Sequence, residues 1–269
     1  MRNSRESKEK SSYPRGLFLV RSQTVANRGA FWYNKNMKVF AISDLHLSIN
    51  NPKPMDVFGE VWNNYLDEIT AFWEKNISDD DVVLIAGDIS WAMNLEGVKP
   101  DLDYIGSFKG KKVLLRGNHD YYWHSISALR ALLPHGTYAV QNDCLRFGKL
   151  LVCGSRGWTT PENGTFTPED KKIYDRELIR LRLSLDDAMK KREEGDKIVL
   201  MTHYPPFNSK FEPSPFTDLI GSYPVDSVVY GHLHGKNVRV RKIVTVGGIP
   251  YYLTSCDMIA NTPVLITEI

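Results

Sequence analysis

Five short apolar runs in this sequence each end in side chains that can bind a metal ion or transfer a proton. The runs are rich in Val, Ile and Leu, which is typical of buried strands. In open α/β sheets, functional side chains gather just beyond the carboxyl ends of the strands. The residues found at the five ends are Asp44 and His46, Asp88, Asn118 and His119, His203, and His232 and His234.

Any one of these groups is weak evidence by itself. An isolated His usually belongs to the core or the surface, and a Gly-Asn pair such as Gly117-Asn118 usually forms a turn. Five of the seven histidines of the chain nevertheless lie at these strand ends. Because independent placement would not produce that pattern, we predict that the five ends meet in one site.

The pattern predicts one α/β domain over residues 37–269. Strands are expected at 37–43, 81–86 and 112–115, and helices at 55–76, 94–108 and 125–133, with the second helix interrupted near Pro100. Alternating strands and helices predict a mainly parallel sheet. The remaining expected strands are 138–140, 144–147 and 150–153, read as a meander, then 197–202 and 227–230, and hairpin segments at 238–246, 250–255 and 263–268.

Between these strands, residues 168–192 read as one long charged helix. Thr167, Pro168 and Asp170 give a capping signal at its start, and Gly195 a stop beyond its end. We expect its charges to form mostly a solvated face.

Residues 1–36 differ from the rest of the chain. They carry eight Lys or Arg against two Glu, a net charge of +6, which leaves −4 for residues 37–269. We predict a disordered basic leader or a spurious N-terminal extension, with targeting as the alternative. The mildly acidic body argues against nucleic acid as a partner.

The three cysteines, Cys144, Cys153 and Cys256, lack CxxC spacing and are read as small buried thiols. They point to a reducing compartment, so we expect a cytoplasmic protein. No run of about 18 apolar residues is present, which predicts no membrane-spanning segment. Oligomeric state is not readable from the sequence.

The candidate ligands combine carboxylates, imidazoles and one amide, whose neutral carbonyl oxygen suits a carboxylate-rich site. This mixture favours Mn, Fe, Zn or Ni over Ca. Seven ligands are too many for one ion, but they divide between two if one carboxylate bridges. Paired ions of this kind serve in-line phosphoryl displacement.

Five segments carry a family resemblance: Asp44-x-His46, Gly87-Asp88, Gly117-Asn118-His119-Asp120, His203 and Gly231-His232-x-His234. In this order they resemble the calcineurin-like metallophosphoesterases, over residues 37 to about 235. The resemblance implies a four-layer β sandwich of two mixed sheets flanked by helices, with the site at one edge.

Carried over by position, the resemblance implies that Asp44, His46, Asp88 and His234 hold a first metal ion. It implies that Asp88, Asn118, His203 and His232 hold a second, with Asp88 as the bridge. The nucleophile would be a metal-bridging hydroxide, and His119 and the adjacent Asp120 would be the catalytic residues. Asn118, His119 and Arg116 are expected to contact substrate, with ion pairing as the alternative for Arg116 and for Arg156.

The expected activity is hydrolysis of a small phosphorylated substrate, which is a phosphomonoester, a phosphodiester or a cyclic nucleotide. Mn is the ion expected to support it in vitro. After Asp88 the chain reads Ile89-Ser90-Trp91 and lacks the phosphate-clamping arginine of Ser/Thr protein phosphatases. Two alternatives stay open: a pyrophosphohydrolase of a nucleotide-linked metabolite, and a non-catalytic scaffold with this fold.

Overall fold

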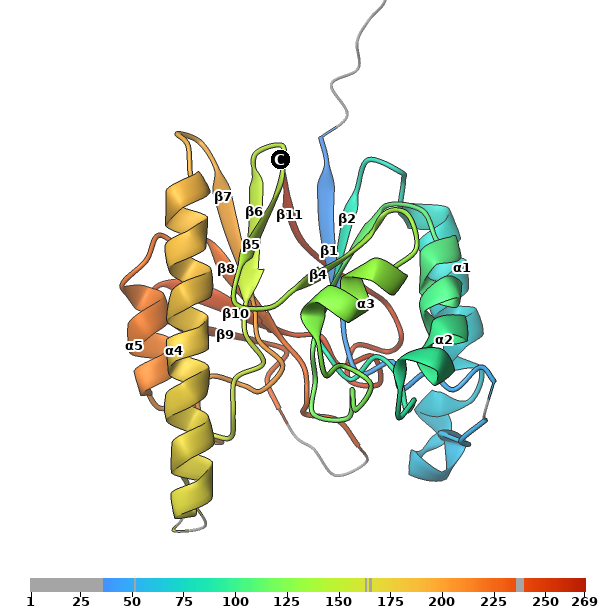
Figure 1. Cartoon of the computed structure of the whole chain (residues 1–269), viewed down its shortest axis with the longest axis horizontal. Helices are drawn as coiled ribbons and strands as arrows, with labels where there is room; N and C mark the ends of the chain where they lie inside the picture. Colours follow the sequence, from blue (N-terminus) through green and yellow to red (C-terminus); the bar gives the residue numbers. More distant parts are fainter. Residues whose placement is uncertain (1–35, 51, 163, 165, 236–239) are drawn as a thin grey trace, which may run out of the picture. The chain divides into compact units, whose positions relative to one another are not determined.

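The computed structural model describes residues 36–269 except 51, 163, 165 and 236–239. Two β-sheets pack against each other, and helices cover their outer faces (Figure 1). This is the layered α/β arrangement expected from the sequence. The predictions made for residues 1–35 and for the start of the 238–246 strand lie outside the described residues.

The first sheet contains five strands in the order β11-β1-β2-β3-β4. Strands β1 to β4 run parallel, and β11 pairs antiparallel with β1 at one edge. The expected parallel sheet is therefore confirmed. The strands are β1 (Lys38–Ile42), β2 (Val82–Ile85), β3 (Lys111–Leu115), β4 (Thr137–Val140) and β11 (Val264–Glu268).

The second sheet contains six strands in the order β5-β6-β7-β8-β10-β9. Its four central strands are parallel, and the edge strands β5 and β9 pair antiparallel with β6 and β10. The strands are β5 (Cys144–Phe147), β6 (Leu150–Gly154), β7 (Lys197–Met201), β8 (Ser227–Tyr230), β9 (Ile243–Val246) and β10 (Ile249–Leu253).

The expected meander over residues 138–153 is wrong in one respect. Strand β4 pairs with β3 in the first sheet, while the β5–β6 hairpin opens the second sheet. The short connection between β4 and β5 thus crosses from one sheet to the other. Which strand β4 pairs with depends on tertiary packing, and the local hydrophobic pattern does not indicate it.

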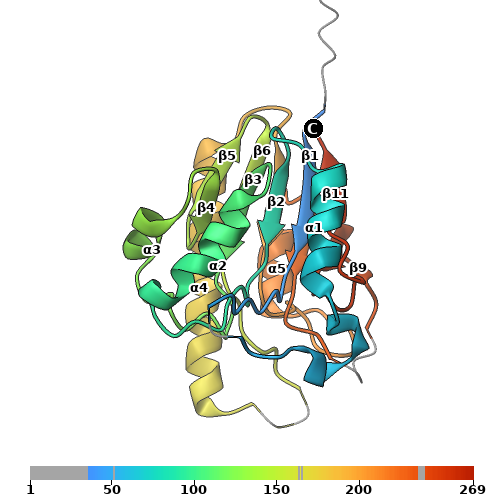
Figure 2. The same cartoon turned by 90° about the vertical axis from the view of Figure 1, so that its right-hand side faces the viewer.

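Helices α1 (Tyr65–Asn76), α2 (Leu95–Ser107) and α3 (Ile126–Leu132) cover the first sheet (Figure 2). Helices α4 (Pro168–Lys191) and α5 (Pro215–Gly221) cover the second (Figure 1). The capping box predicted for α4 is present, since Thr167 and Asp170 bond each other's backbone N–H.

Two helix predictions need correction. The expected helix over 55–76 is two 3₁₀ turns, Asp56–Phe58 and Glu60–Trp62, followed by α1. The α-helix cannot begin earlier because Gly59 (φ 143°) and Asn64 (φ 56°) have positive φ. Helix α2 continues through Pro100, and the side chains of Val98 and Leu102 on either side of it are buried.

The core that joins the two sheets is made of small and branched side chains from their inner faces. In β1, Val39 and Ala41 face the other sheet, while Phe40 and Ile42 face the helices. Val199 and Met201 of β7 belong to the same inter-sheet core. This packing brings the carboxyl ends of the parallel strands of both sheets to one edge of the molecule.

The cysteines match their prediction, since all three are free and buried. Among the described residues, no helix combines the length and apolar character needed to cross a membrane.

Candidate metal centre

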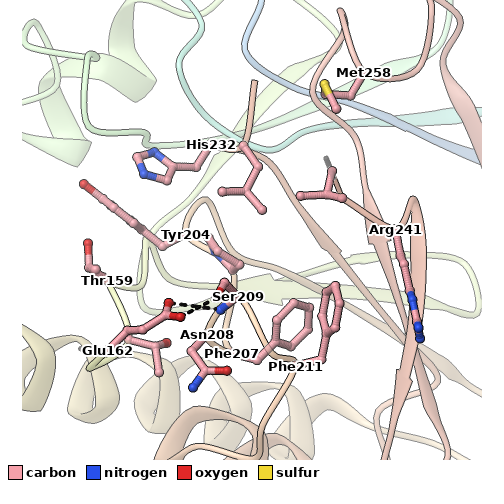
Figure 3. A pocket seen from close by; sticks show the side chains of 14 residues that line it. Thr159, Glu162, Tyr204, Phe207, Asn208, Ser209, Phe211, His232, Arg241 and Met258 are labelled. Atoms are coloured by element: carbon pink, nitrogen blue, oxygen red, sulfur yellow. Dashed lines mark hydrogen bonds between the residues drawn. The ribbon is translucent and has the colours of Figure 1, made fainter. Parts of the chain in front are cut away.

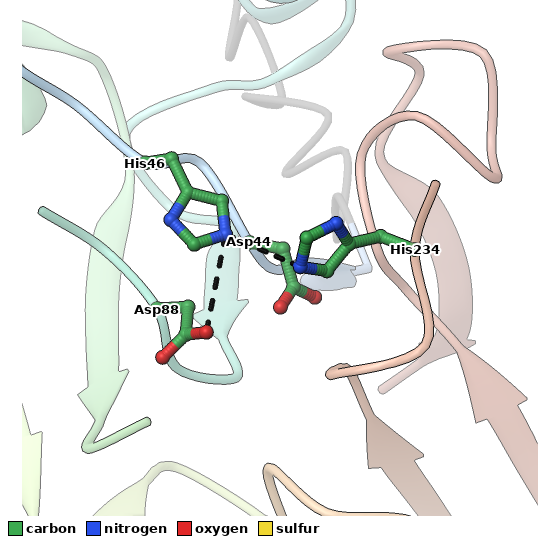
Figure 4. A group of neighbouring side chains, drawn as sticks. All are labelled: Asp44, His46, Asp88 and His234. Carbon is green, nitrogen blue, oxygen red and sulfur yellow. Dashed lines mark hydrogen bonds and ion pairs between the residues drawn. The ribbon is translucent and has the colours of Figure 1, made fainter. Parts of the chain in front are cut away.

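Four side chains meet where β1 and β2 of the first sheet and β8 of the second sheet end (Figure 4). One ligand atom from each of Asp44, His46, Asp88 and His234 lies within 4.8 Å of the other three. The first three residues are buried, and His234 is half-buried. The structure therefore brings together the four residues predicted for the first metal ion.

The backbone of these loops is held in an uncommon conformation. Asp44 (φ 55°), His46 (φ 47°), Asp88 (φ 50°) and His232 (φ 70°) all have positive φ, which L-residues other than Gly adopt rarely. Two cross-strand bonds hold the first loop in place: Asp44 N–H donates to Gly87 O at 2.9 Å, and His46 N–H donates to Asp88 O at 3.0 Å. Such strain is typical of functional sites.

The Asp44 carboxylate is fully buried and well supplied with donors. Ser43 Oγ–H donates to its Oδ2 at 2.6 Å, and His232 N–H lies 3.1 Å from Oδ2 and 3.2 Å from Oδ1. Burial is the main influence on its pKa, which it raises. A nearby cation would compensate for this loss of solvation.

The imidazoles of His46 and His234 face each other across the first group. Their Nε2 atoms are 3.4 Å apart, and His46 Nε2 is 3.9 Å from Asp88 Oδ2. Burial lowers the pKa of His46 to about 3, so this ring is neutral and can offer a lone pair. Trp91 stacks on the same ring with a centroid distance of 4.6 Å and supports its orientation.

A second group meets at Asn118, which follows β3. Its Oδ1 lies 2.8 Å from His203 Nε2 and 3.0 Å from His232 Nδ1. His203 Nε2 is also 3.4 Å from Asp88 Oδ2. These contacts connect Asp88, Asn118, His203 and His232, the set predicted for the second metal ion, and Asp88 is shared with the first group.

The electrostatics of the second group favour a positive charge. Burial opposes protonation of His203, but its contacts with the carboxylates of Asp88 and Asp44 raise its pKa to about 9. Burial lowers the pKa of His232 to about 3. His203 Nδ1 lies 3.0 Å from Ala86 O, and a hydrogen bond there leaves Nε2 as the ligand atom.

Asp88 provides the test of whether metal ions fit these residues. Its Oδ1 accepts the N–H of His119 at 2.8 Å, whereas its buried Oδ2 has no hydrogen-bond partner within the described residues. Burial opposes ionisation, but His203 and His46 outweigh it and hold the pKa of Asp88 below its usual range. A buried carboxylate oxygen without a hydrogen-bond donor and close to two imidazoles fits a divalent ion on either side.

The two predicted catalytic residues, His119 and Asp120, lie beside this centre. The ring of His119 lies 5.6 Å from that of His46, and its buried Nδ1 has no partner in the described part of the chain. Asp120 is fully buried and accepts backbone N–H groups of Gly117 (2.7 Å), Ile89 (2.8 Å) and Ser90 (3.2 Å). Burial raises the pKa of Asp120 to about 6. Its bonds tie the loop after β2 to the loop after β3.

Three glycines in the motifs have a role that the spacing alone did not assign. An added Cβ would lie 2.1 Å from Asp88 Oδ1 at Gly117, 2.5 Å from Asp44 Oδ2 at Gly231, and 2.5 Å from His203 Nδ1 at Gly87. At each position, the glycine backbone therefore lies so close to a candidate ligand residue that a residue with a side chain would clash with it. The repeated Gly before a candidate ligand was the sequence signal for this role.

A hollow of about 820 Å³ adjoins the second group (Figure 3). His232 and Tyr204 form part of its lining, and their rings are 4.2 Å apart. Phe207 and Phe211 add aromatic surface, and Ser209 donates two hydrogen bonds to Glu162. A candidate ligand thus opens onto a largely apolar space.

Comparison with solved structures gives matches of low sequence identity. A protein of unknown function from Aquifex aeolicus is 14% identical, with a TM-score of 0.43, over 86% of this chain and 96% of that one. A phosphopantetheinyl hydrolase from Mycobacterium tuberculosis is also 14% identical, with a TM-score of 0.49, over 82% and 89% of the two chains.

Sequence comparison is more informative. Uncharacterized metallophosphoesterases from two Helicobacter pylori strains are 24% and 25% identical to this chain over 208 residues. These matches cover 76% of the chain but only 46% of each relative, so the chain spans about half their length. The profile of the calcineurin-like phosphoesterases matches residues 37–236, which include both groups of ligands. This chain therefore belongs to the calcineurin-like phosphoesterase family.

Proposed function

We propose that the chain is a dinuclear metal-dependent hydrolase of phosphate esters. The observation that carries the proposal is the shared position of Asp88, whose Oδ2 lies 3.9 Å from His46 Nε2 on one side and 3.4 Å from His203 Nε2 on the other. Family membership supports a phosphoric ester as the substrate. Mn, Fe, Zn and Ni all suit this ligand mixture.

In this proposal, the chain's residues have two roles, metal binding and proton transfer. Asp44, His46, Asp88 and His234 hold one ion, and Asp88, Asn118, His203 and His232 hold the other. Bound divalent ions would supply charge neutralisation for the phosphate oxygens and a water of lowered pKa. His119, beside this centre and with an unpaired buried Nδ1, is placed to protonate the leaving oxygen.

The hollow beside His232 supports a substrate with an organic leaving group. Its volume of about 820 Å³ is in the range of pockets that enclose whole small molecules. Tyr204 and Phe207 are nearly buried and offer aromatic surface at its wall. The same hollow favours a second candidate function, cleavage of the pyrophosphate of a nucleotide-linked metabolite, because a nucleoside would fit there.

The proposal is tested by pairing metal analysis with a substrate screen. Protein purified without chelator should contain two divalent ions per chain, and chelation should abolish hydrolysis of aryl phosphomonoesters or diesters until Mn is returned. Two bound ions without hydrolysis of either ester, or of nucleotide pyrophosphates, would favour the scaffold alternative. Hydrolysis that survives complete metal removal would contradict the proposal directly.

A further inference from the structure

A second hollow, of about 300 Å³, lies at the same edge of the molecule. It is lined where β3, β4 and β6 end and by the N-terminal half of α4. The lining comes from both sheets and from a helix far along the chain. The described residues that line it include four arginines, Arg116, Arg156, Arg176 and Arg180.

The charges around this hollow are unbalanced. One carboxylate, that of Glu177, lines it together with the four guanidinium groups. Glu177 Oε1 lies 2.6 Å from Arg180 Nη1 and 3.7 Å from Arg156 Nη2, so it holds two of the arginines in position. The lining therefore carries an excess of three positive charges, which attracts an anion.

Several polar atoms of the lining have no partner within the described residues. The hydroxyl of Ser155 is one of them, in a residue only 2% exposed. The buried Nε atoms of Arg116 and Arg156 also lack acceptors. Unmet buried donors are costly in a folded protein. Glu177 Oε2 is a buried acceptor of the same lining that also has no partner within the described residues. An oxyanion in the hollow would offer acceptors to the three donors.

Two arginines of the hollow lie next to loops of the metal centre. Arg116 lies two residues before Asn118, the amide ligand proposed for the second ion. The carbonyl of Arg156 accepts the N–H of His203 and that of Tyr204, each at 3.0 Å. Arg116 and Arg156 are therefore anchored to loops that carry ligands.

From these observations we propose that the arginine hollow is a subsite for a second phosphate group of the substrate. The inference rests on the proposed phosphate-ester hydrolysis and narrows its substrates to compounds with two phosphate groups. One group binds between the metal ligands, and the other is held by Arg116, Arg156, Arg176 and Arg180. Guanidinium groups suit this task because they form paired hydrogen bonds to phosphate oxygens.

Binding to metal-free protein tests the subsite without any catalysis. Inorganic phosphate is titrated calorimetrically into chelator-treated wild type and into Arg176→Gln, which removes an exposed guanidinium of the lining. The variant should bind phosphate about tenfold more weakly, the equivalent of one lost charge-assisted contact. Arg182→Gln is the matched control, because Arg182 is exposed on the same helix but lies outside the lining. Equal affinity in all three proteins would overturn the subsite.

Kinetics of the Mn-loaded protein then separate the two phosphate positions. In Arg176→Gln, and more strongly in Arg156→Gln, the KM for adenosine 3′,5′-bisphosphate should rise about tenfold relative to the KM for 4-nitrophenyl phosphate. An equal rise for both substrates would place the arginines on the scissile phosphate and overturn the inference. If the loaded protein hydrolyses neither compound, the proposed function fails, while the binding titration still decides the subsite.

Discussion

The two sheets contribute different chemistry to the metal centre. The ends of β1, β2 and β3 in the first sheet supply every proposed oxygen ligand, Asp44, Asp88 and Asn118, together with His46. The ends of β7 and β8 in the second sheet supply imidazoles alone, from His203, His232 and His234. Each proposed ion takes ligands from both sheets, so neither sheet can complete a site by itself.

This difference explains why the negative charge of the site is concentrated on one side. The carboxylates of Asp44 and Asp88 are both buried, and in each case burial is the largest influence on the pKa. The second sheet contributes no carboxylate, and its His232 ring is neutral because burial lowers its pKa to about 3. A neutral ring costs less to bury than a carboxylate. The sheet that carries the carboxylates should therefore have the larger influence on metal binding.

The largest effect is expected from Asp88→Asn. The amide is neutral and offers one acceptor oxygen, so both ions lose their shared anionic ligand. Metal content should fall well below two per chain, and turnover should drop by about a thousandfold or more. Elemental analysis and initial rates measure the two effects.

Asp103→Asn is the control for this change, because Asp103 is an exposed carboxylate of α2 that pairs with Lys99 at 2.6 Å. It should leave both metal content and turnover unchanged. An Asp88→Asn protein that keeps two ions would end the bridging assignment.

His119→Ala should separate catalysis from metal binding. His119 lies on the first-sheet side but is not among the proposed ligands, so the variant should keep two ions. Turnover should fall by about a hundredfold to ten-thousandfold, the range for loss of a general acid. His135→Ala, an exposed loop position, is the control. Loss of metal in proportion to activity would make His119 a ligand instead.

The features of the site that could be predicted from the sequence are those whose residues lie close together along the chain. Asp44 to His46 and Gly117 to Asp120 are local motifs, and the structure brings their ligand residues together as predicted. The bounds of α1 were wrong, because Asn64 has positive φ and the hydrophobic pattern continues through the turns before it.

Features that depend on packing were the ones missed. Strand β4 was placed in a meander, since its pairing with β3 leaves no local signal. The charges of the 168–192 helix were interpreted as mostly a solvated face, and most of them are exposed, but Arg176, Glu177 and Arg180 line a hollow beside the metal centre. Which side of a charged helix faces a site becomes known only when the sheets are assembled.

Met201→Ala should test the dependence on sheet packing. Met201 is fully buried in the core between the sheets and lies two residues before His203. Its truncation should lower the free energy of unfolding by about 2–5 kcal/mol. Metal affinity at 25 °C should fall less than in Asp88→Asn, because the ligands remain.

Thermal or urea unfolding measures the stability. The control is Met189→Ala, at an exposed position of α4, which should change the free energy of unfolding by less than about 0.5 kcal/mol. Equal stability of the two variants would disprove a central role for this core.

The smallest effects should come from the aromatic rings that support one histidine on each side. Trp91 stacks on His46 at 4.6 Å, and Tyr204 lies 4.2 Å from His232. Each contact is worth about 1 kcal/mol, so removing it should weaken the adjacent ion about fivefold. In Mn titrations that resolve two binding steps, Trp91→Leu should affect the ion held by His46, and Tyr204→Leu the ion held by His232. Each variant is the control for the other. If both weaken the same step, the division of the two ions between the histidines of the two sheets is wrong, even though the seven ligands stay in place.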